Sequence, residues 1–212
     1  MFGFTRRRKW PELPFDEIKK RAQVLVIDDE DFAYKLLFNR DGYRLDKWDD
    51  IDDLPKLENG YYDLILLDIQ GVGREHSHEQ GLGVLKHLRA VNPVQIIVAY
   101  SNADWSLRYQ EFFRMADATL AKGADYVEFK RTVDNLLKQR FSLGFYLDKI
   151  VSVLGDETGD PRHMRELAEK AILTGKTRDI EKALKIGVEK TELVTTVLSI
   201  VKSAITLAAA LC

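Results

Sequence analysis

The sequence has very little cysteine and no surplus of one charge. Its 212 residues include one cysteine, Cys212, and five prolines. A single cysteine excludes an intramolecular disulfide and a zinc site built from several cysteines, and it favours a reducing, cytoplasmic setting. The 32 basic and 34 acidic side chains leave a formal charge of −2, so no overall field attracts nucleic acid. Hydrophobic residues make up 45% of the chain, which is enough for a globular protein with a buried core.

The start of the chain is basic but lacks a long apolar run. We therefore expect no secretory signal, and we assign residues 1–21 to an N-terminal basic arm. Aromatic residues flank the basic run, so contact with an anionic membrane surface stays open beside a solvated arm. The basic residues of the run are Arg6, Arg7, Arg8 and Lys9.

Between residues 22 and 140, short apolar runs alternate with segments of helical period. This alternation is typical of parallel strands joined by crossover helices. The predicted strands are residues 24–27, 43–48, 63–67, 96–100 and 118–121. The predicted helices are residues 31–40, 51–58, 81–91, 106–115 and 125–139. The sequence thus predicts an α/β domain at 22–140, with a doubly wound parallel sheet of five strands.

Beyond residue 140 the pattern is helical only. We expect helices at residues 145–154 and 162–174, a third after Thr177, and a last one from Lys185 or Glu189 onward. Residues 141–212 are therefore predicted to form an α-helical output or oligomerisation region. Its ten basic and ten acidic residues balance, and no basic recognition helix stands out, so binding to nucleic acid is not expected.

Polar side chains follow the predicted strands at the points where these strands end. Asp28 and Asp29 follow the first strand, Asp68 the third, Ser101 the fourth and Lys122 the fifth. Because the carboxyl ends of parallel strands meet at one edge of a sheet, we expect these side chains to converge. Clustered carboxylates repel one another unless a cation joins them, and an all-oxygen set suits Mg²⁺. A carboxylate in such a site is a competent nucleophile toward a phosphoryl group.

Five segments in this order resemble the receiver domain of two-component response regulators. The resemblance covers roughly residues 22–140. The segments are 24–30 (VLVIDDE), 62–68 (YDLILLD), 81–89 (GLGVLKHLR), 96–101 (IIVAYS) and 116–122 (ADATLAK).

The resemblance implies a role for each pocket residue. It implies that Asp68 is phosphorylated by a sensor histidine kinase or a phosphotransfer protein, and that Asp28 and Asp29 bind Mg²⁺ with Asp68. The backbone carbonyl of Gln70 would complete the protein ligands. Ser101 and Lys122 would bind the phosphoryl group, since Lys130 lies too far along the chain and falls on a helix. We expect no enzymatic turnover beyond autophosphorylation and autodephosphorylation.

The sequence departs from the receiver pattern after Asp68 and around the lysine. Gly123 stands where the family usually has proline, and Thr119 stands at the position of the switch aromatic. The loop from Asp68 to Gly81 is longer than usual. It carries four residues that either ligate a transition metal or form an exposed polar loop beside the pocket. These residues are Glu75, His76, His78 and Glu79.

The final segment, residues 193–211, is apolar apart from Ser, Thr and one charge, Lys202. Its length approaches a bilayer span, whereas a charge at mid-membrane is costly. We expect either a soluble helix that buries its apolar stripe in a bundle or homo-oligomer, or a helix that inserts in a membrane. The sequence therefore predicts a phosphorylation-controlled signalling protein whose helical region changes its association. The alternatives are a membrane-acting effector under control of the receiver part and a scaffold that works without phosphate.

Overall fold

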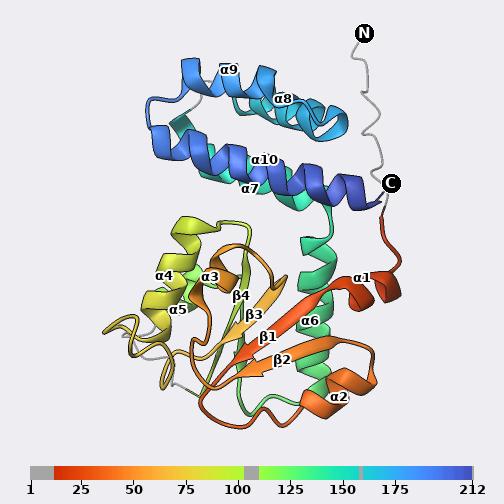
Figure 1. Cartoon of the computed structure of the whole chain (residues 1–212), viewed down its shortest axis with the longest axis vertical. Coiled ribbons are helices and arrows are strands. Elements are labelled where there is room, and N and C mark those ends of the chain that lie inside the picture. The colour runs from red at the N-terminus through yellow and green to blue at the C-terminus, as the bar shows by residue number, and fades with distance from the viewer. Residues whose placement is uncertain (1–11, 103–109, 158–159, 212) are drawn as a thin grey trace.

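The computed structural model describes residues 12–102, 110–157 and 160–211 of the chain. A parallel sheet of five strands, in the order β2-β1-β3-β4-β5, forms the centre of the first part (Figure 1). This strand order is that of the flavodoxin-like doubly wound fold. The predicted fold class is therefore confirmed. The strands are β1 (Gln23–Ile27), β2 (Arg44–Trp48), β3 (Leu64–Leu67), β4 (Ile96–Ser101) and β5 (Ala118–Ala121).

Helices cover both faces of the sheet because the strand residues alternate between two cores. Val24 and Val26 of β1 face one core, and Leu25 and Ile27 face the other. All four are buried, as expected for a parallel strand covered on both sides. The first core is covered by α1 (Phe15–Arg21), α2 (Lys35–Arg40) and α6 (Tyr126–Arg140), and the second by α3 (Leu54–Glu58), α4 (Gly81–Val91) and α5 (Gln110–Met115).

Several predicted boundaries differ from the structure, and the helix predicted at 51–58 begins at Leu54. Residues 15–21, assigned above to the basic arm, form helix α1, because Ile18 is buried in the core beneath it. The helix predicted at 31–40 begins only at Lys35. The rest of the predicted arm, residues 1–11, and the first part of the helix predicted at 106–115 lie outside the described residues.

The described residues after Arg140 form four α-helices around a core of their own, as the periodicity predicts. Ala168, Ile180, Leu184 and Val201 of this core are completely buried. We call this unit the C-terminal bundle. It consists of α7 (Leu143–Leu154), α8 (Pro161–Thr174), α9 (Arg178–Gly187) and α10 (Thr191–Leu211), with a short 3₁₀ helix, Gly155–Glu157, after α7.

The C-terminal bundle lies at the end of the sheet where the strands begin (Figure 1). Val94, just before β4, belongs to the core of the bundle, and Phe145 of α7 packs against the cores of both units. Lys149 of α7 forms an ion pair of 3.4 Å with Asp117, just before β5. The carboxyl ends of the strands, where the predicted site lies, are therefore at the edge far from the bundle.

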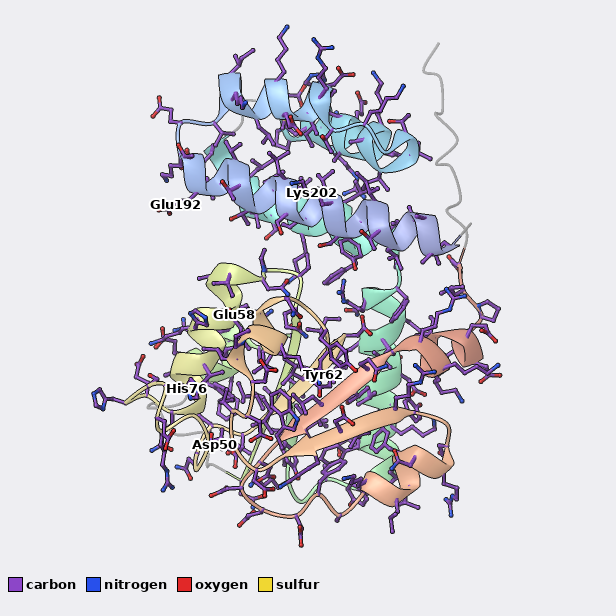
Figure 2. The ribbon with its side chains drawn as sticks, in the orientation of Figure 1. Asp50, Glu58, Tyr62, His76, Glu192 and Lys202 are labelled. Atoms are coloured by element: carbon purple, nitrogen blue, oxygen red, sulfur yellow. The ribbon has the colours of Figure 1, made fainter. Side chains whose placement is uncertain are left out.

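Helix α10 is long and apolar enough to cross a membrane, a test that the core helix of a soluble protein also passes. Four residues of its apolar stripe, Val197, Ile200, Val201 and Ala204, are buried in the core of the bundle, and most of its other apolar residues are partly buried against that core. Its exposed face is polar and carries Glu192 at the start and Lys202 further along (Figure 2). The same chain thus covers this part of the stripe, which corresponds to the alternative of a soluble helix in a bundle.

The burial of α10 predicts that its two faces respond differently to the same substitution. Val201→Asp places an unpaired charge in the core of the bundle and should lower the free energy of unfolding by about 3–5 kcal/mol. Ser199→Asp places the same side chain on the exposed face, so the change should stay within about 0.5 kcal/mol. Denaturant unfolding followed by circular dichroism measures both. Equal destabilisation by the two variants would contradict the observed packing of α10.

Candidate functional site

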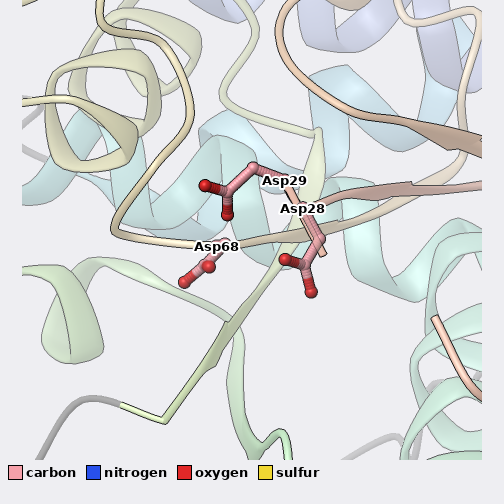
Figure 3. A group of neighbouring side chains, drawn as sticks. All are labelled: Asp28, Asp29 and Asp68. Carbon is pink, nitrogen blue, oxygen red and sulfur yellow. The ribbon is translucent and has the colours of Figure 1, made fainter. Parts of the chain in front are cut away.

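The register of the sheet brings the predicted acidic residues together. Ile27 of β1 pairs with Leu67 of β3, so Asp28 and Asp68 follow their strands at the same level. Both side chains are buried, with 0% and 3% of their surface exposed, whereas Asp29 is exposed. Ligand atoms of the three carboxylates lie within 4.8 Å of one another (Figure 3). The convergence expected from the strand ends is therefore present.

Lys122, directly after β5, connects the carboxylates. Its Nζ lies 2.7 Å from Oδ1 of Asp28, 2.8 Å from Oδ2 of Asp68 and 3.0 Å from Oε2 of Glu30. The edge strand β5 reaches this position because it pairs with β4 up to Ser101 and Ala121. Lys122 is thus the cation of the pocket.

Lys130, the alternative lysine, lies away from the pocket. Its Nζ is 2.7 Å from the hydroxyl of Tyr43 and 4.8 Å from the centre of that ring. On α6 it also faces Asp134, at 3.5 Å. The structure therefore separates the two lysines as the sequence predicts.

Burial and hydrogen bonding act in opposite directions on the charges of the pocket. Burial raises the pKa of Asp68 above its usual value, although hydrogen bonding to Lys122 and to the N–H of Gln70 opposes this rise. Burial alone would lower the pKa of Lys122, but its bonds to Asp28, Asp68 and Glu30 outweigh burial and raise it. Lys122 is therefore a cation at neutral pH.

A small cavity of about 270 Å³ opens beside Asp68. Oδ1 of Asp68 accepts the backbone N–H of Ile69 at 2.6 Å, which fixes the carboxylate toward this space. Ser101, at the end of β4, and Lys122, directly after the neighbouring strand β5, both line the cavity. The other lining residues are Asp29, Glu30, Gln70, Gly71, Arg74 and Asn102.

Three observations fit a divalent cation held by oxygen ligands. Oδ2 of Asp28 is buried and has no hydrogen-bond partner, which is costly unless an ion or water binds it. The pocket holds four carboxylates, those of Asp28, Asp29, Glu30 and Asp68, against the single ammonium of Lys122. An all-oxygen donor set of this kind suits Mg²⁺, which retains several waters.

Gly71 provides the third observation. It has a φ of +85°, and a Cβ at this position would lie 2.3 Å from Oδ2 of Asp29. Glycine adopts this left-handed backbone without strain, and it has no Cβ that would collide with the Asp29 carboxylate. The space around the three carboxylates is therefore kept open by the backbone.

The loop after Asp68 does not form a second metal site. Among the described residues, the only group of three or more His, Cys, Asp or Glu side chains placed to hold a metal is Asp28, Asp29 and Asp68. The four loop residues considered above are exposed, and Glu79 pairs with Lys86 at 2.9 Å. The alternative of an exposed polar loop is the one that the structure supports.

Glu30, which follows Asp28 and Asp29 after the first strand, contacts Lys122. The structure adds Arg74 and Asn102, which line the cavity and which the sequence did not place in the pocket. The aromatic ring beside Lys122 belongs to Tyr100 of β4, and its centre lies 5.6 Å from Nζ of Lys122. The family's switch aromatic would instead come from β5. Thr119, at the position of the family's switch aromatic, is half-buried. The order of acidic residues in the sequence could indicate Glu30, but no pattern indicates Arg74.

Comparison with solved structures identifies similar receiver domains. A two-component response regulator from Clostridium difficile is 21% identical, with a TM-score of 0.48, over 57% of this chain and 99% of that one. A CheY-like receiver domain protein from Methanospirillum hungatei is 19% identical, with a TM-score of 0.47, over 56% of this chain and 95% of that one. The response regulator TrrA from Thermotoga maritima, solved with Mg²⁺-BeF, is 26% identical, with a TM-score of 0.45, over 54% of this chain and 98% of that one.

No protein-family model and no curated protein matches the sequence. These solved structures match slightly more than half of this chain. The strand order of the sheet is the one expected for the receiver fold.

The contact between Gly71 and Asp29 predicts a specific loss of metal binding. Gly71→Ala should displace the Asp29 carboxylate and weaken Mg²⁺ binding about 10-fold, the scale of losses for groups that orient ligands. Gly42→Ala is the matched control, since Gly42 has a φ of +88° and no atom within 4 Å of an added Cβ. Both variants should lose about 1–2 kcal/mol of stability to left-handed backbone strain. Calorimetric titration with Mg²⁺ should show weaker binding only for Gly71→Ala, and a similar loss in Gly42→Ala would contradict the assignment.

Proposed function

We propose that this chain is a response-regulator-like signalling protein in which Asp68 accepts a phosphoryl group. The observation that carries the proposal is the buried Asp68 carboxylate, 2.8 Å from the Lys122 ammonium and next to Asp28 and Asp29. A buried ion pair alone is weak support, because such pairs also occur without function. Here the pair borders an open cavity and an unsatisfied carboxylate oxygen, which a purely structural pair does not need.

The phosphoryl donor is proposed to be a phosphohistidine of a sensor kinase or phosphotransfer protein. An oxygen of the Asp68 carboxylate attacks phosphorus, a P–O bond forms, and the P–N bond of the donor breaks. The electron pair of that bond stays on the imidazole nitrogen. Bound Mg²⁺ would supply charge neutralisation for the phosphoryl oxygens. Asp28, Asp29 and the Asp68 carboxylate would hold it together with the backbone carbonyl of Gln70.

The remaining pocket residues prepare the site for the added charge. Lys122 is a cation that already lies against Asp68, so it can contact a phosphoryl oxygen with little movement. Ser101 also lines the cavity and carries a hydroxyl that can donate a hydrogen bond to the same group. The backbone N–H of Ile69 holds the Asp68 carboxylate in position during the transfer.

We propose that the C-terminal bundle carries the output of this switch. The bundle contacts the sheet at Val94 and Asp117, at the edge opposite the pocket. A change in the pocket would reach it through the strands that carry Asp68, Ser101 and Lys122 at their carboxyl ends. The proposal includes a cytoplasmic location and self-association of the chain. Its alternative is membrane contact through α10. The burial of the α10 stripe within the chain favours the form in which α10 stays in the bundle.

The assignment of Asp68 predicts that one carboxylate carries the phosphoryl group. Incubation with a small phosphodonor and Mg²⁺ should add one phosphoryl group to the wild type and none to Asp68→Asn, because an amide oxygen is a poor nucleophile. Asp31→Asn is the control, since Asp31 is exposed and lies three residues after Asp28. Intact-protein mass spectrometry measures the added mass. Labelling of Asp68→Asn equal to that of the wild type would contradict the assignment.

The position of Lys122 predicts that it transmits the change rather than holding the metal. Lys122→Met removes the ammonium but keeps the three carboxylates, so Mg²⁺ binding should persist. Beryllofluoride with Mg²⁺, which mimics the acyl phosphate, should then change amide hydrogen exchange in α7 of the wild type and not in the variant. Lys130→Met should behave like the wild type. An unchanged response of α7 in Lys122→Met would contradict this role.

A further inference from the structure

Arg74 is the one cationic residue of the pocket wall that the function above does not use. It lies in the loop between β3 and α4 and lines the cavity beside Asp68 together with Asp29, Gln70 and Lys122. It also lines a second, larger cavity of about 500 Å³ that shares Gln70 and Gly71 with the first. Arg74 therefore stands at the border between the candidate site and the space next to it.

The loop that carries Arg74 is anchored on both sides of this residue. Val72 is completely buried in the core beneath α4, and the backbone N–H of Gly73 donates to the Asp50 carboxylate. The carbonyl of Gly73 accepts the N–H groups of His76 at 3.1 Å and Ser77 at 2.9 Å, which closes a tight turn that contains Arg74. A turn of this kind fixes the Cα of Arg74 beside the pocket.

The guanidinium of Arg74 is available to a ligand. Other charges around the larger cavity are already paired, because Lys86 contacts Glu79 at 2.9 Å and Glu111 at 3.1 Å. Within the described part of the chain, by contrast, no ion pair or hydrogen bond holds the exposed side chain of Arg74. An arginine on an ordered loop, next to a cavity and without a partner, is suited to bind an anion that arrives there.

The charges of the pocket show why a second cation is useful. Lys122 contacts three carboxylates, Asp29 lies beside them, and a phosphoryl group on Asp68 adds further negative charge. A divalent cation and Lys122 together do not offset these charges. A guanidinium can donate two parallel hydrogen bonds to phosphoryl oxygens, which a lysine cannot do.

We infer that Arg74, in addition to Lys122, is a binding residue for the phosphoryl group on Asp68. This inference rests on the proposed function of Asp68. In it, Arg74 contacts the phosphoryl group from the loop between β3 and α4 and closes the cavity once the group is bound. The length of this loop then has a purpose, because it brings a second cation to the pocket.

The test measures beryllofluoride binding in the presence of Mg²⁺ by calorimetry, on the full chain. Arg74→Gln should bind beryllofluoride roughly tenfold more weakly than the wild type, the factor expected for one charge-assisted contact in a partly exposed site. Arg74→Lys should recover part of this loss. Arg44→Gln is the matched control, because Arg44 is exposed and starts β2 at the opposite edge of the sheet. Mg²⁺ binding without beryllofluoride should not weaken in Arg74→Gln.

Each outcome decides one of the two proposals. Equal affinity of Arg74→Gln and the wild type would overturn the role of Arg74 and leave the function of Asp68 standing. An equal loss in Arg44→Gln would overturn it too, since net charge would then explain the effect. Absence of beryllofluoride binding to the wild type would overturn both proposals.

Discussion

The contact of Lys122 with Asp28 and Asp68 is the interaction on which the carboxyl edge of the sheet depends. Two buried carboxylates side by side repel each other strongly in a medium of low dielectric constant. Lys122, at 2.7 and 2.8 Å, offsets this repulsion and ties the edge strand β5 to the central strands β1 and β3. The same contact keeps the ammonium next to the cavity. The Lys122 side chain therefore both stabilises this edge of the sheet and places a positive charge where an anion can bind.

Most of the fold could be predicted because burial on both faces leaves a strong pattern. Continuous apolar runs such as Leu64–Leu67 indicate central parallel strands, and all four of these residues are buried. Helix α1 was missed because its seven residues bury only Ile18, so their pattern has little apolar period. Helix α2 begins later than predicted, because residues 31–34 precede it as a loop and turn that the sequence does not distinguish from a helix start.

The sequence predicts the site residues that directly follow strands. It does not predict a residue that a loop brings back to the pocket. Asp28, Asp68 and Lys122 are fixed by the register of paired strands, which sequence order reflects directly. Arg74 reaches the pocket through Gly71, Val72 and the contact of Gly73 with Asp50, a residue 23 positions earlier in the chain. Such a long-range contact leaves no periodic signal. The covered stripe of α10 shows the same limit, since its pattern indicates an apolar face but not what covers it.

The junction between the receiver-like domain and the C-terminal bundle has almost no linker. Helix α6 ends at Arg140, α7 begins at Leu143, and Phe145 packs against the cores of both units. Phe145 is partly buried against each core, so a short connection and a shared contact join the two units instead of a long tether. A ligand that binds only the folded protein stabilises the unit that holds its site. A ligand at the carboxyl edge of the sheet would reach the helices of the bundle through this junction.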